Sequence, residues 1–257
     1  MSLTDRIIKI SVRNLVEFIF KTGDINTGLG MGQDIMAMQE GAKIHRMLQK
    51  EAGECYHAEV SLKVQIERQT DNNIDYQIQL EGRADGIIYD LDKPDNSNVC
   101  IDEIKTMQSD INMLKEPIYV HKAQAMCYGY MYLMQNHLEN IDIRLTYCNS
   151  QTREIKQYTE HFTAAVLIDW FDNVIETFSK WIDFLLKHKQ SRKSSIVNLQ
   201  FPYDYRPAQR DLVVSVYKAI QQKRNLYIQA STGVGKTLST IFPTVAAMGQ
   251  DYVDKIF

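Results

Sequence analysis

The sequence predicts an α/β fold in which a mixed central sheet of about five strands is flanked by helices, followed by a shorter second α/β segment. Stretches that alternate apolar and polar residues with a period of two interleave with longer stretches whose apolar residues recur every three to four positions. Near the C-terminus, a glycine-rich turn stands between a short apolar run and a helix-like run. Strands interleaved with helices are typical of a sheet covered by helices.

The elements follow one another at short intervals. Ser11 is a suitable N-cap for the first helix, in which Val12, Leu15, Val16 and Ile19 form one apolar stripe. We expect helices at about 11–21, 32–51, 117–137 and 163–187, and strands near 58–66, 74–88, 99–106, 141–148 and 153–159.

Two of the predicted strands carry carboxylates that could meet. Alternation places Asp85 on the polar face of the strand 74–88, and it places Glu103 and Lys105 together on one face of the next strand. Residues 90–98 are rich in Asp, Asn, Pro and Ser and are expected to form the turn between them. An antiparallel pairing centred near Pro94 puts residue 85 opposite residue 103.

Opposed carboxylates need a counter-charge. Cβ atoms of directly opposed residues lie roughly 4.5 to 5.5 Å apart, and two carboxylates so close repel unless a cation lies between them. Oxygen ligands suit Mg²⁺, Mn²⁺ or Ca²⁺, and Lys105 would project beside the ion. A solvated strand face with ordinary surface charges is the alternative explanation, and it is the favoured one for Glu59 on the strand 58–66.

Three further residues have both a structural and a chemical interpretation. His45 lies on or beside the buried stripe of the helix 32–51, either as a core histidine or as a metal ligand. Gln124 and Tyr128 are four residues apart and therefore neighbours on one helix face. Alone, they are equally consistent with the edge of an amphipathic helix.

The order and spacing of these residues resemble the RecB-type PD-(D/E)xK nucleases. The resemblance covers about residues 7 to 185 and rests on Gly41-x-x-x-His45, Gly82-Arg83-Ala84-Asp85, Ile101-Asp102-Glu103-Ile104-Lys105-Thr106 and Gln124-x-x-x-Tyr128.

The resemblance implies a role for each position. His45, Asp85, Glu103 and the carbonyl of Ile104 would bind Mg²⁺ or Mn²⁺. Lys105 would position or activate the attacking water, while Gln124 and Tyr128 would contact the substrate strand or support Lys105. The sequence has Ala84 where the stricter motif has Pro, a variation found in the RecB branch.

A second motif follows near the C-terminus. The segment Ala230-Ser-Thr-Gly-Val-Gly-Lys-Thr237 comes after an expected short strand, Leu226 to Gln229, and precedes a helix-like run. In such a loop the backbone N–H groups, with Gly233 and Gly235 at the turn, surround phosphates, Lys236 contacts the β and γ oxygens, and Thr237 binds Mg²⁺.

The second motif also carries a resemblance. Ala230 in place of the first Gly is usual in superfamily-two helicases, and the run Phe201-Pro-Tyr-Asp-Tyr-Arg-Pro-x-Gln209 resembles the adenine-recognition element of DinG/XPD-type helicases, in which Gln209 would bind adenine. Only twenty residues follow Thr237. We therefore expect a nuclease domain at 1–190, a basic linker at 191–200 and a fragment of a RecA-like ATPase lobe at 201–257, with ATP used only by a longer parent helicase.

The composition of the chain limits which partners and cofactors are expected. A net charge of −3 gives no global attraction for nucleic acid, so binding must come from local patches such as residues 187–193. The four cysteines lack a Cys-x-x-Cys pair, so we expect free thiols in a reducing cytoplasm and no iron-sulfur cluster. No apolar run is long enough to span a membrane.

The sequence thus favours a divalent-metal-dependent deoxyribonuclease, an exonuclease rather than an endonuclease, acting on single-stranded DNA ends or flaps in DNA repair or processing. Its partners would be DNA and the remainder of the helicase. The alternative is a non-catalytic DNA-binding module that guides a strand to the helicase motor.

Overall fold

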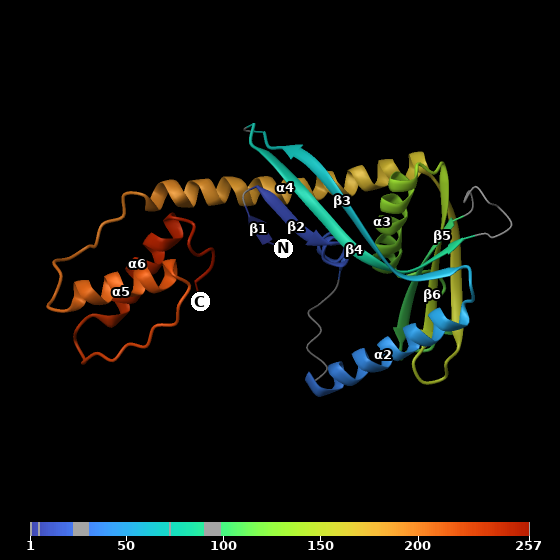
Figure 1. Cartoon of the computed structure of the whole chain (residues 1–257), viewed down its shortest axis with the longest axis horizontal. Coiled ribbons are helices and arrows are strands. Elements are labelled where there is room, and N and C mark those ends of the chain that lie inside the picture. Colours follow the sequence, from blue (N-terminus) through green and yellow to red (C-terminus); the bar gives the residue numbers. More distant parts are fainter. Residues whose placement is uncertain (1, 5, 23–30, 72, 90–98, 257) are drawn as a thin grey trace. The chain divides into compact units, whose positions relative to one another are not determined.

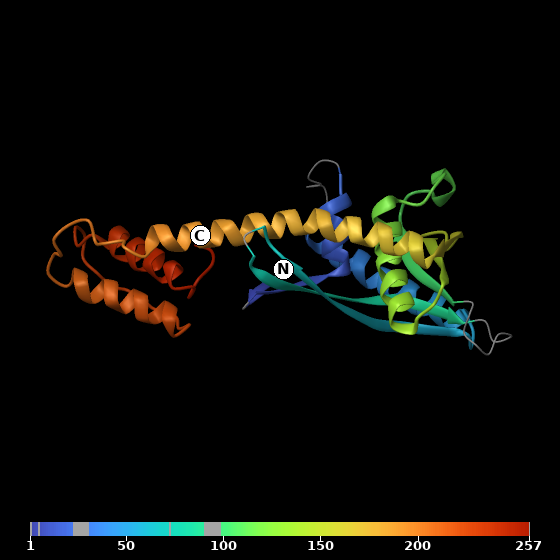
Figure 2. The same ribbon diagram turned by 90° about the horizontal axis from the view of Figure 1, so that it is seen from above.

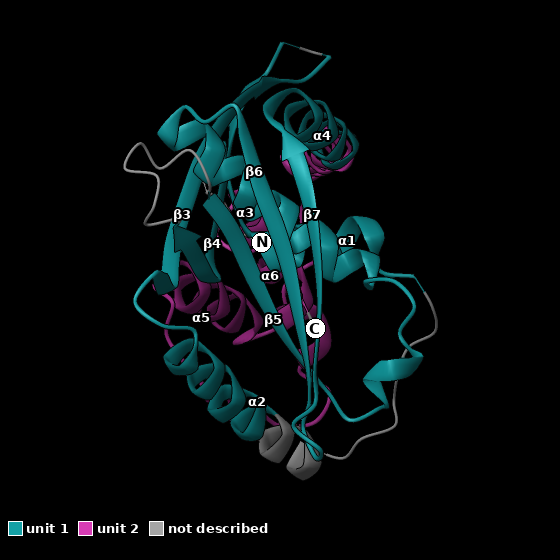
Figure 3. Cartoon of the chain, turned by 90° about the vertical axis from the view of Figure 1, so that its right-hand side faces the viewer, with its two compact units in different colours: residues 1–180 teal, residues 181–257 magenta. Residues whose placement is uncertain are grey.

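The structure, a computed structural model, describes residues 2–4, 6–22, 31–71, 73–89 and 99–256, with the backbone alone for 2–4 and 31–37. The chain divides into two compact units, residues 1–180 and 181–257, and each is described by itself (Figure 3). The expected turn at 90–98 lies outside the described residues.

The first unit is built on a mixed sheet that has seven strands in the described part of the chain (Figure 1). The strands are β1 (Ser2–Thr4), β2 (Ile7–Ser11), β3 (Tyr56–Gln69), β4 (Asp75–Tyr89), β5 (Val99–Met107), β6 (Asn140–Asn149) and β7 (Ile155–Thr163). They run in the order β1-β2-β4-β5-β6-β7, and β3 pairs with β4.

Strand β4 changes partner halfway along its length. Its first half, Gln77 to Glu81, pairs in parallel with β2, whereas its second half, Gly86 to Tyr89, pairs antiparallel with β5. On its other side β4 keeps one partner, β3, from Asp75 to Ile88, with an interruption at Asp85. The sheet therefore forks at residues 82–85, between the last pair with β2 and the first pair with β5.

Helices cover both faces of the sheet (Figures 2 and 3). They are α1 (Val12–Phe20), α2 (Met31–Glu51), α3 (Tyr119–Asn136) and the first part of α4 (Ala164–Ile196), with a short 3-10 turn at Ile111–Met113. Ser11 caps α1 as expected, because its Oγ accepts a hydrogen bond from the N–H of Asn14 at 3.2 Å.

The helices form two layers. Tyr130 of α3 stacks on Phe171 of α4 with ring centroids 3.8 Å apart, and Phe18 of α1 meets Phe178 of α4 edge to face. Gly129 of α3 lies against Ile143, whereas residues of α2 line a pocket together with Arg144, the next residue of β6. Because neighbouring strand residues point to opposite faces, α1, α3 and α4 cover one face and α2 covers the other.

The predicted α/β architecture is confirmed. The five strands expected between residues 58 and 159 and the four expected helices are present at nearly the expected positions, although α4 continues to Ile196. The N-terminal strands β1 and β2 were not expected, because two strands of three and five residues give little alternation to detect. No helix in the described ranges is long and apolar enough to cross a membrane.

The second unit contains the end of α4, then α5 (Gln209–Gln221) and α6 (Lys236–Gly249). The strand expected at Leu226 to Gln229 is absent, and Tyr227 within it is 92% exposed. A strand needs a hydrogen-bonded neighbour, and no segment described around it supplies one.

The basic run expected to be a solvated linker instead lies in α4, which continues to Ile196. Lys189 and Lys193 pair with Asp251, and Arg192 pairs with Asp254. These pairs give the basic side chains partners within the second unit.

Gly86 allows an aromatic ring to cross β4, and this predicts a large effect of a small substitution. A Cβ at Gly86 would lie 1.9 Å from Cζ of Tyr56. We expect Gly86→Ala to lower the free energy of unfolding by about 1 to 3 kcal/mol through overpacking, measured by urea denaturation. In a Tyr56→Ala background the same substitution should cost little; an equal cost in both backgrounds would contradict the proposed clash.

Candidate functional site

Asp85 lies at the fork of the sheet. Asp85 and Glu103 stand at the position directly after the last β4–β5 pair, Gly86 with Asp102, so the register expected from the sequence is confirmed. There the Asp85 carboxylate, not a backbone carbonyl, accepts the hydrogen bond of the Ile104 N–H, with Oδ2 at 2.8 Å from the nitrogen. The Asp85 side chain thus continues the hydrogen-bond ladder between β4 and β5 at the point where the two backbones separate.

The alternation of β4 is interrupted at the same place. A Cβ at Gly82 would meet Tyr128 of α3 and Val12 of α1, whereas a Cβ at Gly86 would meet Tyr56, whose ring lines the α2 face. Residues four apart in a regular strand share a face. Glu59 of β3, opposite Asp85, has a positive φ of 59°, so both strands are irregular beside the site.

Helix α2 holds the fork from one side. His45 Nδ1 lies 3.3 Å from Oδ1 of Asp85. One helical turn later, the Gln49 amide donates hydrogen bonds to the Asp85 carbonyl at 2.9 Å and to Oε1 of Glu59 at 3.1 Å. Arg83 pairs with the other oxygen of Glu59 at 2.5 Å. Gln49 therefore fixes the backbone of Asp85, a role that no motif in the sequence indicates.

Helix α3 holds the site from the other face through a chain of polar contacts. Lys105 Nζ donates to Oε1 of Glu103 at 2.7 Å and to Oε1 of Gln124 at 3.1 Å. The Gln124 amide in turn donates to the Tyr128 hydroxyl at 3.4 Å. Tyr128 is 3% exposed, so its position fits support of Lys105 rather than contact with a substrate.

Glu103 is a deeply buried ionisable group of the site. It is 1% exposed, and its Oε2 has no hydrogen-bond partner. Burial raises the pKa of Glu103 to about 8, against the lowering effect of Lys105 and with a smaller raising effect from Asp85. A buried carboxylate oxygen without a donor is expensive in free energy, and a cation would remove that cost.

The donor set fits a hard divalent cation by chemical type. His45, Asp85 and Glu103 supply the imidazole and carboxylates that the resemblance assigns to Mg²⁺ or Mn²⁺, beside the strand that carries Ile104. As these side chains lie, no group of three His, Cys, Asp or Glu in the described ranges converges on one metal position. The pairs His45–Asp85 and Lys105–Glu103 would have to loosen for a cation to enter.

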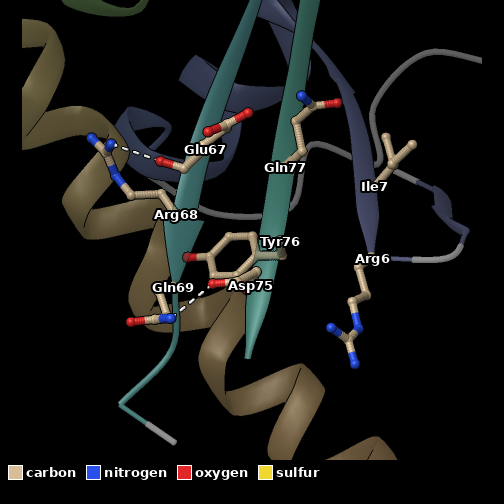
Figure 4. A pocket seen from close by; sticks show the side chains of 8 residues that line it. All are labelled: Arg6, Ile7, Glu67, Arg68, Gln69, Asp75, Tyr76 and Gln77. Carbon is tan, nitrogen blue, oxygen red and sulfur yellow. Dashed lines mark hydrogen bonds between the residues drawn. The ribbon is translucent and has the colours of Figure 1, made fainter. Parts of the chain in front are cut away.

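Two pockets meet at this site. One lies between α1, α3 and β5 and is lined by residues that include Arg13, Lys21, Tyr119 and Lys105. The other lies beside α2 and is lined by Arg83, Glu59 and Asp85, of which Asp85 is half-buried. His45 and Thr106 line both pockets. A further pocket lies at the end of β3 and the start of β4 (Figure 4). None of the residues that line it is predicted from the sequence as a site residue.

His121 lies beside the site, although no pattern in the sequence indicates it. It lines the pocket with Lys105, and its Nδ1 lies 3.2 Å from the Tyr147 hydroxyl, which also accepts the Ile118 N–H at 3.0 Å. Burial, with smaller contributions from Lys105 and Arg13, lowers the pKa of His121 to about 4. The imidazole is therefore neutral near pH 7.

In the second unit, the structure brings the two predicted nucleotide-binding elements together. Gly233 and Gly235 have φ values of 82° and 81°, and a Cβ at Gly235 would meet the Gln209 amide at 2.4 Å. Arg206 donates to the Gly233 carbonyl. Thr237 is in the first turn of α6, which begins at Lys236.

Comparison with known proteins gives a limited result. No protein-family model matches the chain. A segment of 47 residues, 18% of the chain, is 43% identical to a protein of Methanocaldococcus jannaschii named probable ATP-dependent helicase MJ0942. The chain spans 7% of the length of that relative. The comparison thus supports a relationship to helicases over this segment.

A solved structure, titled crystal structure of SSO0001, aligns with 69% of the chain and 78% of its own length, at 21% identity and a TM-score of 0.41.

The raised pKa of Glu103 predicts a pH dependence of stability. Its folded-state pKa, about 8, lies above the ordinary value of 4.5, so the folded state holds the proton more tightly than the unfolded state. The resulting stabilisation is fully present below pH 4.5 and is lost as the pH rises to about 8. Glu103→Gln should remove this loss, as measured by the free energy of unfolding against pH.

An exposed control, Glu139→Gln, should leave the pH profile unchanged. If wild type and Glu103→Gln lost stability in parallel between pH 4.5 and 8, Glu103 would not be the titrating group.

Proposed function

We propose that the first unit is a divalent-metal-dependent nuclease that hydrolyses phosphodiester bonds of single-stranded DNA ends or flaps. One observation carries the proposal: Asp85, Glu103 and Lys105 meet at the fork of the sheet, with a buried Glu103 oxygen that has no partner. His45 contacts the Asp85 carboxylate. These are the residue types that metal-assisted phosphodiester hydrolysis needs.

Each of these side chains has a different role in the proposed reaction. His45, Asp85 and Glu103, with the Ile104 carbonyl, would hold Mg²⁺ or Mn²⁺, which when bound lowers the pKa of a water and neutralises charge on the phosphate. Lys105 would orient the attacking water and place a positive charge beside the scissile phosphate. Gln124 keeps Lys105 in position, and Tyr128 keeps Gln124 in position.

The second unit favours a nuclease that works with a motor. We propose that Gln209, Gly233, Gly235, Lys236 and Thr237 bind ATP in a complete helicase, to which the similarity with the Methanocaldococcus protein adds support. A non-catalytic module that guides a strand to the motor is the alternative. It is favoured by the finding that the expected metal ligands do not converge as they lie.

Cleavage of end-labelled DNA separates the two functions. We expect the chain to degrade single-stranded DNA with Mg²⁺ or Mn²⁺ but not with EDTA. Asp85→Ala and Lys105→Ala should each lower the rate at least about 100-fold, because each removes a group that stabilises charge at the reacting phosphate. Asp169→Ala and Lys180→Ala, exposed residues of α4, are the matched controls. Full activity in the Asp85 or Lys105 variant would refute the nuclease assignment.

The phosphate-binding loop should act independently of cleavage. Lys236→Ala should weaken binding of a fluorescent ATP analogue at least about tenfold, because the ammonium group would contact the β and γ oxygens. The same variant should cleave DNA at the wild-type rate. A large loss of cleavage would show instead that the loop takes part in the nuclease reaction.

A further inference from the structure

An aromatic cluster stands at the rim of the pocket that contains Lys105. Phe20 of α1 and Tyr119 of α3 meet edge to face, with ring centroids 5.1 Å apart, and Phe20 stacks on Trp170 of α4. The Trp170 indole N–H donates to the Tyr119 hydroxyl at 3.2 Å. Tyr119 nevertheless remains 49% exposed. It is a ring fixed at its hydroxyl end, with half of its surface open to the solvent.

Cations stand beside this cluster. Arg13, Lys21 and Lys105 line the same pocket. The positive charges of Arg13, Lys21 and Lys105 all act on Glu17 and lower the pKa of its carboxyl. Glu17 itself pairs with Arg13 at 2.8 Å, and Lys21 is the exposed C-cap residue of α1. The rim therefore combines an exposed aromatic ring with an excess of positive charge.

The two pockets of the site differ in whether they combine an exposed aromatic ring with positive charge. The pocket beside α2 has arginines, Arg46 and Arg83, and carboxylates but no Phe, Tyr or Trp among the residues that line it. An aromatic ring next to a positive groove is the arrangement that binds unpaired bases by stacking while cations contact the backbone. Paired bases inside a duplex offer no free face to such a ring.

We propose that Tyr119, supported by Phe20 and Trp170, is a stacking platform for one unpaired base of a single-stranded DNA on the Lys105 side of the scissile phosphate. Lys21 and Arg13 contact the phosphates beside that base. The inference rests on the proposed function, since it takes DNA as the ligand of the neighbouring site. It adds the place, the residues and the requirement for an unpaired nucleotide.

Binding of a fluorescent oligothymidylate to the full chain, in EDTA so that no cleavage competes, tests the platform. We expect Tyr119→Ala to raise the Kd about tenfold, and Tyr119→Phe, which keeps the ring, to bind nearly as wild type. Phe184→Ala removes another exposed aromatic residue, 55% exposed on α4, and should have no effect. Lys21→Ala should lower the slope of log Kd against log salt by about 0.7, the value for one single-strand phosphate contact.

An abasic scan makes the test specific. One abasic position should weaken binding to wild type about as much as Tyr119→Ala does, and the variant should not respond to that position. Wild-type affinity of Tyr119→Ala, or an equal response of both proteins at every position, would overturn the platform. Single-strand binding with this pattern but without cleavage in Mg²⁺ would overturn the nuclease alone. No binding of wild type to DNA, together with no cleavage in Mg²⁺, would overturn both.

Discussion

The hydrogen bond from the Ile104 N–H to the Asp85 carboxylate is the interaction on which the site depends. Strand β4 must leave β2 and join β5, and the residues between the two pairings, 82–85, are paired with neither strand on that side. A carboxylate that accepts the next N–H of β5 bridges this interval. It also fixes Asp85 beside Glu103, with His45 and Gln49 of α2 holding it from the other side. The irregular backbone and the placement of the proposed metal ligands therefore have one cause.

Much of this arrangement could be predicted from the sequence, because strand alternation and a turn of known centre determine which residues stand opposite each other. The opposition of residues 85 and 103 follows from the turn alone, and the proximity of Gln124 to Tyr128 follows from helical spacing. The alternation of residues along the sequence could not reveal that the alternation is interrupted within β4. Gly82 and Gly86 have the same parity but face opposite layers, and this change occurs where β4 passes from one partner to the next.

The residues that the sequence missed are those whose role depends on tertiary position. Gln49 is an ordinary polar residue of a helix until the Asp85 carbonyl is placed within its reach. His121 and Tyr119 lie on a helix whose other residues already account for its amphipathic pattern, and their pocket is completed by α1, about a hundred residues earlier. The strand expected at 226–229 failed for a related reason, since apolar composition does not supply a hydrogen-bonded neighbour.

Lys236 illustrates how the predicted phosphate-binding loop can hold a lysine in place without neutralising its charge. Its ammonium group donates to the carbonyls of Ala230 and Ser231, at 2.9 and 2.8 Å, and to no carboxylate in the described part of the chain. Carbonyl dipoles hold the side chain but do not cancel its charge. An incoming phosphate would therefore replace two neutral acceptors and break no ion pair, so the loop stays attractive to anions while its lysine remains ordered.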